Sequence, residues 1–155
     1  MGKTSIEWAE HSWNPIVGCS KVSPGCANCY AERLTGVQLF KQIRLFPERL
    51  EEPIHRKKPT IYFVCSMSDL FHPLIPADYR SKIFDSMEKA PQHDYLLLTK
   101  RPELMREWFQ EWGRPKRNFW LGTSIESQTF AFREAILGTI DADVRFISAE
   151  PLLGP

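Results

Sequence analysis

A strand, a short polar loop and a helix follow one another repeatedly along this chain. Runs of β-branched and aromatic residues, such as 60–65 (TIYFVC), predict strands that are buried on both faces. Polar residues follow each run, and a helical spacing of apolar residues comes next. The expected strands lie at 11–17, 60–65, 95–99, 119–123 and 144–148, and the expected helices at 30–40, 76–89, 103–112 and 129–138.

This order of elements predicts an α/β fold built from parallel βα units. The last strand has no helix after it, which leaves either an open doubly wound sheet or part of a (β/α) barrel. No glycine-rich phosphate loop follows any expected strand, so a nucleotide-binding Rossmann domain is disfavoured. The chain has 155 residues and 43% of them are apolar, which suffices for a real core. We expect one domain over residues 1–155.

Three of the four cysteines cluster in the loop that follows the first strand. Cys19, Cys26 and Cys29 are spaced C-x6-C-x2-C, and Pro24 and Gly25 give the segment between them the character of a turn. Thiolates this close in sequence can bind one metal centre. Three of them could hold a [4Fe–4S] cluster and leave one iron open to a small molecule.

Other interpretations of the cysteines remain open at this point. A structural zinc site needs a fourth ligand, for which the candidates are His11, His55, His72 and Cys65. Cys65 itself lies in an apolar strand and is expected to be a small buried side chain. Disulfides are disfavoured because the amino terminus does not resemble a signal peptide. Simple buried thiols would not explain the clustering on one loop.

Polar side chains gather where the expected strands end. In a parallel sheet these carboxyl ends share one rim, so we expect the cysteine loop and the polar loops to meet there. Some of these residues, Asp69 among them, can instead cap the next helix. The Ser-x-Glu pairs at 124–126 and 148–150 favour a function, because side chains two positions apart in an extended chain point the same way. The polar residues concerned are Ser66, Ser68, Asp69, Thr99, Lys100, Arg101, Thr123, Ser124, Glu126, Ser148 and Glu150.

The composition excludes some classes of protein. No apolar run approaches the roughly 20 residues that span a bilayer, so we expect no membrane association. The net charge of +1 argues against a protein that coats nucleic acid by electrostatics alone, although a local basic groove stays open. Clustered thiols without a secretion signal predict a cytoplasmic protein.

Five motifs in order resemble a known family. They are the cysteine loop, SMSDLFH (66–72), LLTKRPE (97–103), LGTSIESQ (121–128) and FISAEPLLGP (146–155). Together they resemble the bacteriophage and prophage three-cysteine family of unknown function, which is similar to radical S-adenosylmethionine (SAM) enzymes. The resemblance covers residues 6–155.

The resemblance implies a partial, TIM-like (β/α) barrel with a [4Fe–4S] cluster on Cys19, Cys26 and Cys29. Two features depart from the radical SAM pattern, whose spacing is C-x3-C-x2-C with an aromatic residue before the last cysteine. Here the first gap is six residues, and Asn28 holds the aromatic position with Tyr30 just after it. Members of the family continue beyond the last motif. We therefore expect a barrel truncated after its fifth strand, with an edge that a partner chain or a second copy covers.

The resemblance also implies a reaction. An electron donor would reduce the cluster, and SAM bound at the open iron would be cleaved to a 5′-deoxyadenosyl radical that modifies a substrate. A nucleic acid is our expectation for that substrate, on the phage association alone. By loop order, the expected cofactor-binding residues are Tyr30, Ser66, Ser68, Asp69, Ser124, Glu126 and Ser148, and the expected catalytic residues are Lys100 and Glu150. The alternative is a phage-associated binding module that a zinc ion stabilises, without catalysis.

Overall fold

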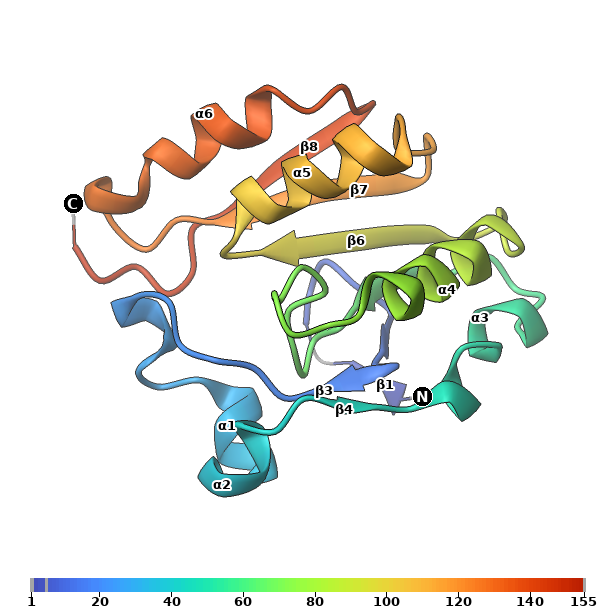
Figure 1. Ribbon diagram of the computed structural model, residues 1–155, viewed down its shortest axis with the longest axis horizontal. Coiled ribbons are helices and arrows are strands. Elements are labelled where there is room, and N and C mark those ends of the chain that lie inside the picture. Colours follow the sequence, from blue (N-terminus) through green and yellow to red (C-terminus); the bar gives the residue numbers. More distant parts are fainter. Residues whose placement is uncertain (1, 5, 155) are drawn as a thin grey trace.

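The computed structural model describes residues 2–4 and 6–154 (Figure 1). The strands are β1 (Gly2–Lys3), β2 (His11–Trp13), β3 (Ile16–Val17), β4 (Arg44–Leu45), β5 (Ile61–Val64), β6 (Asp94–Thr99), β7 (Phe119–Ser124) and β8 (Val144–Ser148). The helices are α1 (Tyr30–Thr35), α2 (Val37–Phe40), α3 (Glu52–His55), α4 (Ala77–Glu88), α5 (Pro102–Trp112) and α6 (Phe132–Gly138), with short 3-10 helices η1 (Pro24–Cys26), η2 (Pro47–Arg49) and η3 (Gln128–Phe130). None of the helices in these described ranges is long and apolar enough to cross a membrane.

The predicted parallel sheet is confirmed. Strands β2, β5, β6, β7 and β8 run parallel and lie side by side in that order, while β1 pairs antiparallel with β2 at one edge. Helices alternate with the parallel strands, so the fold is α/β and consistent with a partial (β/α) barrel. The register aligns Thr99 with Thr123 and Ser124 with Ser148. The carboxyl ends of neighbouring strands therefore meet at one rim.

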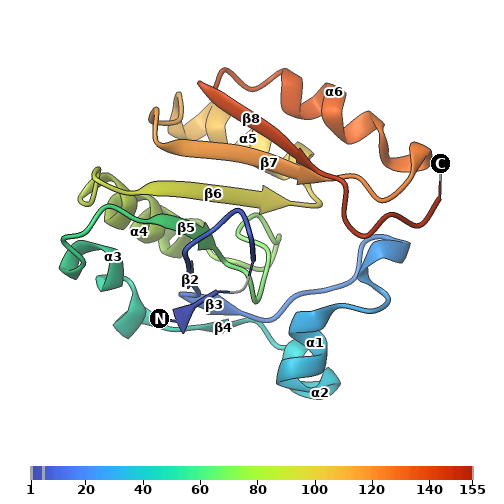
Figure 2. The same ribbon diagram turned by 180° about the vertical axis from the view of Figure 1, so that it is seen from behind.

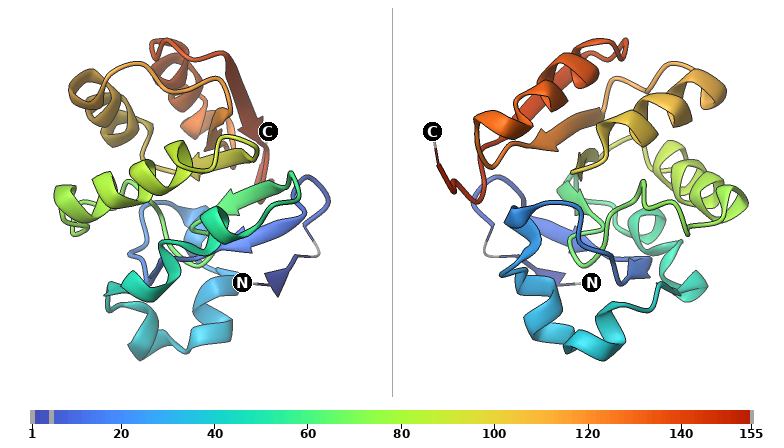
Figure 3. Two further views of the ribbon diagram at one scale, coloured as in Figure 1. Left: turned by 90° about the vertical axis from the view of Figure 1, so that its right-hand side faces the viewer. Right: turned by 60° about the vertical axis from the view of Figure 1, so that its left-hand side comes forward.

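Helices α4, α5 and α6 cover one face of this sheet, as Figures 1 and 2 show from opposite sides. In Figure 3 the strands curve around a common interior, with these helices on the outside. The main core lies between the sheet and the helices. There the fully buried Phe84 of α4 meets Phe119 of β7 and Trp108 of α5, with ring centroids 5.8 and 5.4 Å apart. Each such aromatic side chain contributes about 1.5–3 kcal/mol by leaving water.

The strand expected at 11–17 is divided into two strands that join different sheets. Strand β2 pairs with β5, whereas β3 pairs antiparallel with β4 in a separate two-stranded sheet. Asn14 and Pro15 stand at the break, because proline has no N–H to continue the ladder. Gly18 then turns the chain with φ 111°, and a Cβ there would lie 2.1 Å from the carbonyl oxygen of Gln42. This turn at Gly18 leads directly into the cysteine loop.

The helix expected at 30–40 is also divided. Gly36 has φ 87°, a left-handed conformation that ends α1 and redirects the chain into α2. Leu34, Val37 and Phe40 recur at the three-residue spacing that predicts one buried stripe of a helix, and this prediction is wrong. Leu34 and Val37 are 75% and 51% exposed, and only Phe40 of the three is buried. The expected helix at 129–138 likewise begins with the separate turn η3.

Candidate functional site

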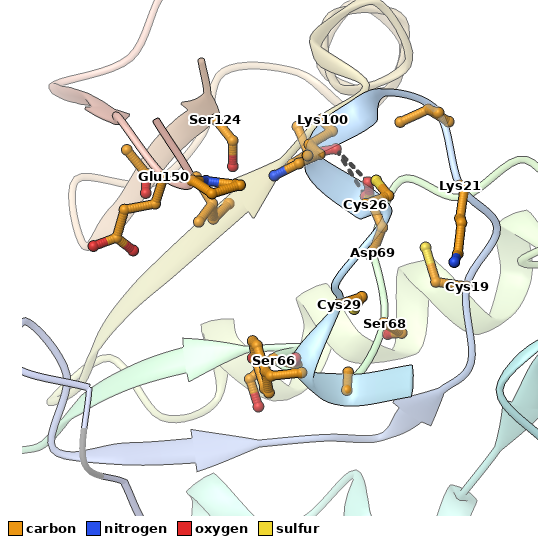
Figure 4. A pocket seen from close by; sticks show the side chains of 18 of the residues that line it. Cys19, Lys21, Cys26, Cys29, Ser66, Ser68, Asp69, Lys100, Ser124 and Glu150 are labelled. Atoms are coloured by element: carbon orange, nitrogen blue, oxygen red, sulfur yellow. Dashed lines mark hydrogen bonds between the residues drawn. The ribbon is translucent and has the colours of Figure 1, made fainter. Parts of the chain in front are cut away.

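A cavity of about 590 Å³ lies at the carboxyl ends of the parallel strands (Figure 4). The cysteine loop forms one of its walls, and residues at the carboxyl ends of β5, β6, β7 and β8 form others. Among the predicted site residues, Glu126 alone does not line it. Those that do are Cys19, Cys26, Cys29, Tyr30, Ser66, Ser68, Asp69, Lys100, Ser124, Ser148 and Glu150. The structure thus brings these residues together, and their individual roles remain predictions.

Local sequence explains the shape of the cysteine loop. Pro24 begins the single turn η1, where its fixed φ suits the first helical position. The amide of Cys26 donates to the carbonyl of Ser23 at 2.9 Å, and Cys29 has the extended conformation (φ −60°, ψ 122°) that precedes α1. Cys19, Cys26 and Cys29 are free thiols of intermediate exposure. Each is open to the cavity and able to take a ligand.

The three thiols do not form a ready-made site for one ion. Among the residues that the structure describes, no group of three or more His, Cys, Asp or Glu side chains could hold a metal ion as placed. Thiolates that share one tetrahedral zinc must lie about 4 Å apart, because each Zn–S bond is about 2.3 Å long. In a [4Fe–4S] cluster each thiolate binds a different iron, so the sulfurs need not converge on one point.

Arg101 holds the first part of the loop. This side chain, only 5% exposed, donates to Asp69 Oδ2 at 2.8 Å, to the Ser20 carbonyl at 2.9 Å and to Ser20 Oγ at 3.0 Å. The same guanidinium lies 3.7 Å from Cys19 Sγ. Burial, followed by the charge of Asp69, raises the pKa of the Cys19 thiol to about 11, and Arg101 opposes this rise. Arg101 is therefore the cation that favours a thiolate, or any other negative charge, at this position.

Asp69 and His72 complete this group of contacts. Asp69 accepts hydrogen bonds from Thr99 Oγ1 at 2.8 and 2.9 Å, so both of its oxygens are occupied within the protein. His72 Nδ1 accepts from the amide of Leu74 at 3.2 Å, which leaves the proton on Nε2 to face Ser20 Oγ at 2.8 Å. Burial lowers the pKa of His72 and keeps this ring neutral. Both ring nitrogens are thus engaged away from the cysteine sulfurs.

Glu126 lies beneath the second part of the loop. It is fully buried, and its Oε2 accepts from Arg133 at 2.7 Å while Lys100 Nζ lies 3.7 Å from its Oε1. The Ser23 hydroxyl donates to the same Oε1. A Cβ on Gly25 would lie 2.4 Å from Glu126 Cγ, so only glycine fits above this carboxylate. The expected role of Glu126 in cofactor binding stays a prediction, and both of its oxygens already have partners within the protein.

Tyr30 links α1 to the end of β5. Its hydroxyl donates to the carbonyl of Ser66, and its ring lines the cavity. Ser66 Oγ in turn accepts from Asn14 Nδ2 at 3.0 Å. Ser68 contacts the thiol of Cys65, whose pKa burial raises to about 12. Cys65 is buried in the core, as its apolar surroundings predicted.

The opposite wall is more open and partly apolar. Ser124 and Ser148 are neighbours in register, and the exposed Glu150 lies across the cavity from the cysteines in Figure 4. Trp8 packs against Phe63 with centroids 4.8 Å apart. The apolar side chains that line the cavity include Ile6, Trp8, Phe40, Phe63, Leu98 and Leu153. A ligand here would meet hydroxyls and one carboxylate on a mainly apolar wall.

Sequence reasoning missed most of the contacts that shape the loop. Ser20, Ser23 and Arg133 were not predicted at the site, whereas Arg101 was expected among the polar residues of the rim and His72 as a candidate zinc ligand. Arg101 carried a signal, since it stands between the end of a strand and the proline that opens a helix, at the rim itself. Arg133 carried none, because it lies in a helix and reaches back to the rim.

The family comparison covers nearly the whole chain. The family model described as "Protein of unknown function (DUF5131)" matches residues 3–155, which include the cysteine loop and every strand end at the cavity. No curated protein and no solved structure matches the chain. The chain therefore belongs to this family of proteins of unknown function.

Proposed function

We propose that this protein is a radical SAM-type iron–sulfur enzyme of phage association, which cleaves SAM reductively in order to modify a substrate. One observation carries the proposal: Cys19, Cys26 and Cys29 line the same cavity as the polar residues at the ends of the parallel strands. In (β/α) barrels this rim is where cofactors and substrates bind. The volume of about 590 Å³ lies within the range of roughly 300–1,000 Å³ typical of small-molecule sites.

The residues present suit a three-thiolate cluster. Cys19, Cys26 and Cys29 would hold it, each as the ligand of a separate iron, and all three line the cavity. When bound and reduced, such a cluster supplies the electron that cleaves a carbon–sulfur bond of SAM. The guanidinium of Arg101, 3.7 Å from Cys19 Sγ, would stabilise the negative charge of the thiolates.

The other residues of the cavity would bind and orient SAM. Ser66 and Ser68 stand near the cysteines and suit its amino acid end, while Ser124 and Ser148 offer hydroxyls at the opposite wall (Figure 4). Asp69 and Glu126 would support the site without contacting SAM, because their carboxylates already form ion pairs with buried arginines. Glu150 has the most freedom to contact the substrate or exchange a proton with it. The apolar wall would exclude water from the reacting groups.

Partners complete the proposal. Reduction needs an electron donor, and a nucleic acid is the substrate that we propose to test first, on the phage association. A partner chain or a second copy would pair along β8, which is the edge strand of the sheet and exposes 41% of Ile147. Sedimentation of the purified protein tests this pairing, which a strictly monomeric protein would contradict.

Anaerobic purification with iron and sulfide analysis tests the function. We expect a brown protein with about four irons and four sulfides per chain, which forms 5′-deoxyadenosine from SAM after reduction. Cys29→Ala should lose both iron and product. Cys65→Ala is the matched control, because it removes a thiol outside the loop and should leave the iron content unchanged.

The outcomes separate the two candidate functions. A colourless protein with one zinc per chain and no affinity for SAM would replace the enzyme by the zinc-stabilised binding module. A protein with bound iron that never cleaves SAM would contradict the radical SAM reaction while keeping the cluster.

A further inference from the structure

The loop between Cys19 and Cys26 is longer than the radical SAM pattern, and its extra residues make specific contacts. The side chains of Ser20 and Ser23 both point from this segment onto buried charged groups. Ser20 contacts Arg101 and His72, and Ser23 donates to Glu126. The long gap therefore contains two hydroxyls, each placed on a separate anchor in the barrel.

The first anchor consists of Arg101 and Asp69, in the loops after β6 and β5. Arg101 is fixed by its ion pair with Asp69 at 2.8 Å, where both side chains are less than a tenth exposed. From this position it binds both the carbonyl and the hydroxyl of Ser20. Three hydrogen bonds from one planar guanidinium leave it little freedom to turn. Ser20, and with it the neighbouring Cys19, is held at one place on the rim.

The second anchor consists of Glu126, in the loop after β7, and Arg133 of α6. Glu126 and Arg133 form an ion pair of 2.7 Å, in which the carboxylate side chain is 0% and the guanidinium side chain 3% exposed. Arg133 also donates to the Ser124 carbonyl at 2.8 Å, so the pair is tied to the end of β7. Ser23 and Gly25 rest directly on the Glu126 carboxylate. A buried ion pair held in this way changes its geometry little.

We propose that these two anchors fix the cysteine loop in one conformation before any metal binds, with Arg101 and Glu126 as positioning residues. Loops that a metal alone shapes must lose their conformational freedom when the metal binds, which weakens binding. Here that freedom is lost when the barrel folds. The loop is thus ordered in the metal-free protein, and a bound metal leaves it more slowly. Only this last consequence rests on the proposed function.

Hydrogen exchange of the metal-free full chain tests the proposal directly. The amides of Cys26 and Ala27 donate within the loop, to Ser23 and Pro24, at 2.9 Å each. We expect these amides to be protected in the metal-free wild type. Ser23→Ala should make them exchange about tenfold faster, since it removes a hydrogen bond to a charged group. The amides of α4 should keep their rates.

Two variants separate positioning from general stability. Ser23→Thr keeps the hydroxyl, and the extended backbone of Ser23 (φ −155°, ψ 166°) suits threonine, so it should restore protection. Ser81→Ala removes a hydroxyl from α4, which bonds only within its own helix at Ala77, and should change nothing in the loop. Ser23→Ala leaves the Glu126–Arg133 pair intact, so the fold survives the test.

A second readout follows iron. After reconstitution, iron release to a chelator should be about tenfold faster from Ser23→Ala than from wild type, and normal from Ser23→Thr. Unprotected Cys26 and Ala27 amides in the metal-free wild type would overturn the proposal, as would a Ser23→Ala variant with unchanged exchange. Failure of the chain to bind iron would overturn the proposed function instead, because the exchange result needs no metal.

Discussion

The face of the sheet that α4 and α5 cover and the segment from Cys19 to Phe40 are built by different means. On the helix-covered face, apolar side chains such as Phe84, Tyr95 and Phe119 are almost wholly out of water. Within 19–40, the buried residues are Ala31, Glu32 and Phe40 alone, although the segment lines the cavity. Burial holds the scaffold, whereas hydrogen bonds and ion pairs hold the loop. The two regions should therefore respond differently to the loss of volume and of charge.

The largest effect should come from the scaffold. Phe84→Ala removes a ring that contacts Trp108, Phe109, Trp112 and Phe119, and should lower the free energy of unfolding by about 3–5 kcal/mol. Urea denaturation followed by circular dichroism measures this. Leu34→Ala, at a site 75% exposed in the cysteine segment, should change it by less than about 0.5 kcal/mol. Comparable losses of unfolding free energy in Phe84→Ala and Leu34→Ala would contradict the difference between the scaffold and the cysteine segment.

The second largest effect on stability should come from the buried Glu126–Arg133 ion pair beneath the loop. Arg133→Met keeps much of the side-chain volume but leaves the buried Glu126 carboxylate with Lys100 as its nearest cation, at 3.7 Å. Breaking a buried ion pair should cost about 3 kcal/mol of unfolding free energy. Arg117→Met, at an exposed arginine, is the matched control and should have almost no effect in the same denaturation experiment. An Arg133→Met variant with an unchanged free energy of unfolding would show that the pair does not anchor the loop.

The fit of the loop gives a smaller effect. Gly25→Ala places a methyl group 2.4 Å from Glu126 Cγ, and Arg133 prevents the carboxylate from moving away. We expect a loss of about 2 kcal/mol in thermal or urea unfolding, with faster exchange of the loop amides. At Gly138, a Cβ would meet nothing within 4 Å, so Gly138→Ala should be neutral or slightly stabilising. Equal effects at both glycines would rule out the close contact.

The smallest effect is a dependence on alkaline pH that belongs to the scaffold. Burial raises the pKa of Cys65 from 9.0 to about 12, so the folded chain keeps this proton between those pH values while the unfolded chain loses it. Stability is therefore fully present below pH about 9 and falls as the pH rises toward 12.

Cys65→Ala should make this decline shallower between pH about 9 and 10, where the Cys65 thiol contributes together with Cys19, whose pKa burial raises from 9.0 to about 11. Tyr62 and Tyr79, whose pKa values burial also raises to about 12 from 10.0, should preserve the decline above that. Urea midpoints at several alkaline pH values measure the slope. An unchanged slope in Cys65→Ala would mean that the thiol ionises as easily in the folded state.

The same contrast explains what the sequence could and could not predict. Buried strands such as β5 and β7 were found because continuous apolar runs report burial directly, and the parallel order then placed the cavity. The stripe at Leu34 and Val37 failed because periodicity cannot register that Gly36 takes a positive φ. The contacts of Ser20 and Ser23 with the two anchors could not be predicted from the sequence either. Contacts such as Ser23 with Glu126 depend on a tertiary approach that no local pattern encodes.

The position of Trp8 gives the protein a built-in optical probe. Among the tryptophans that the structure describes, Trp8 alone lines the cavity, and it stacks obliquely against Phe63 and Phe146 on the inner side of the sheet. Its fluorescence should consequently change when a molecule enters, while the emission of the other indoles stays constant. Titrations can then follow occupancy without any label.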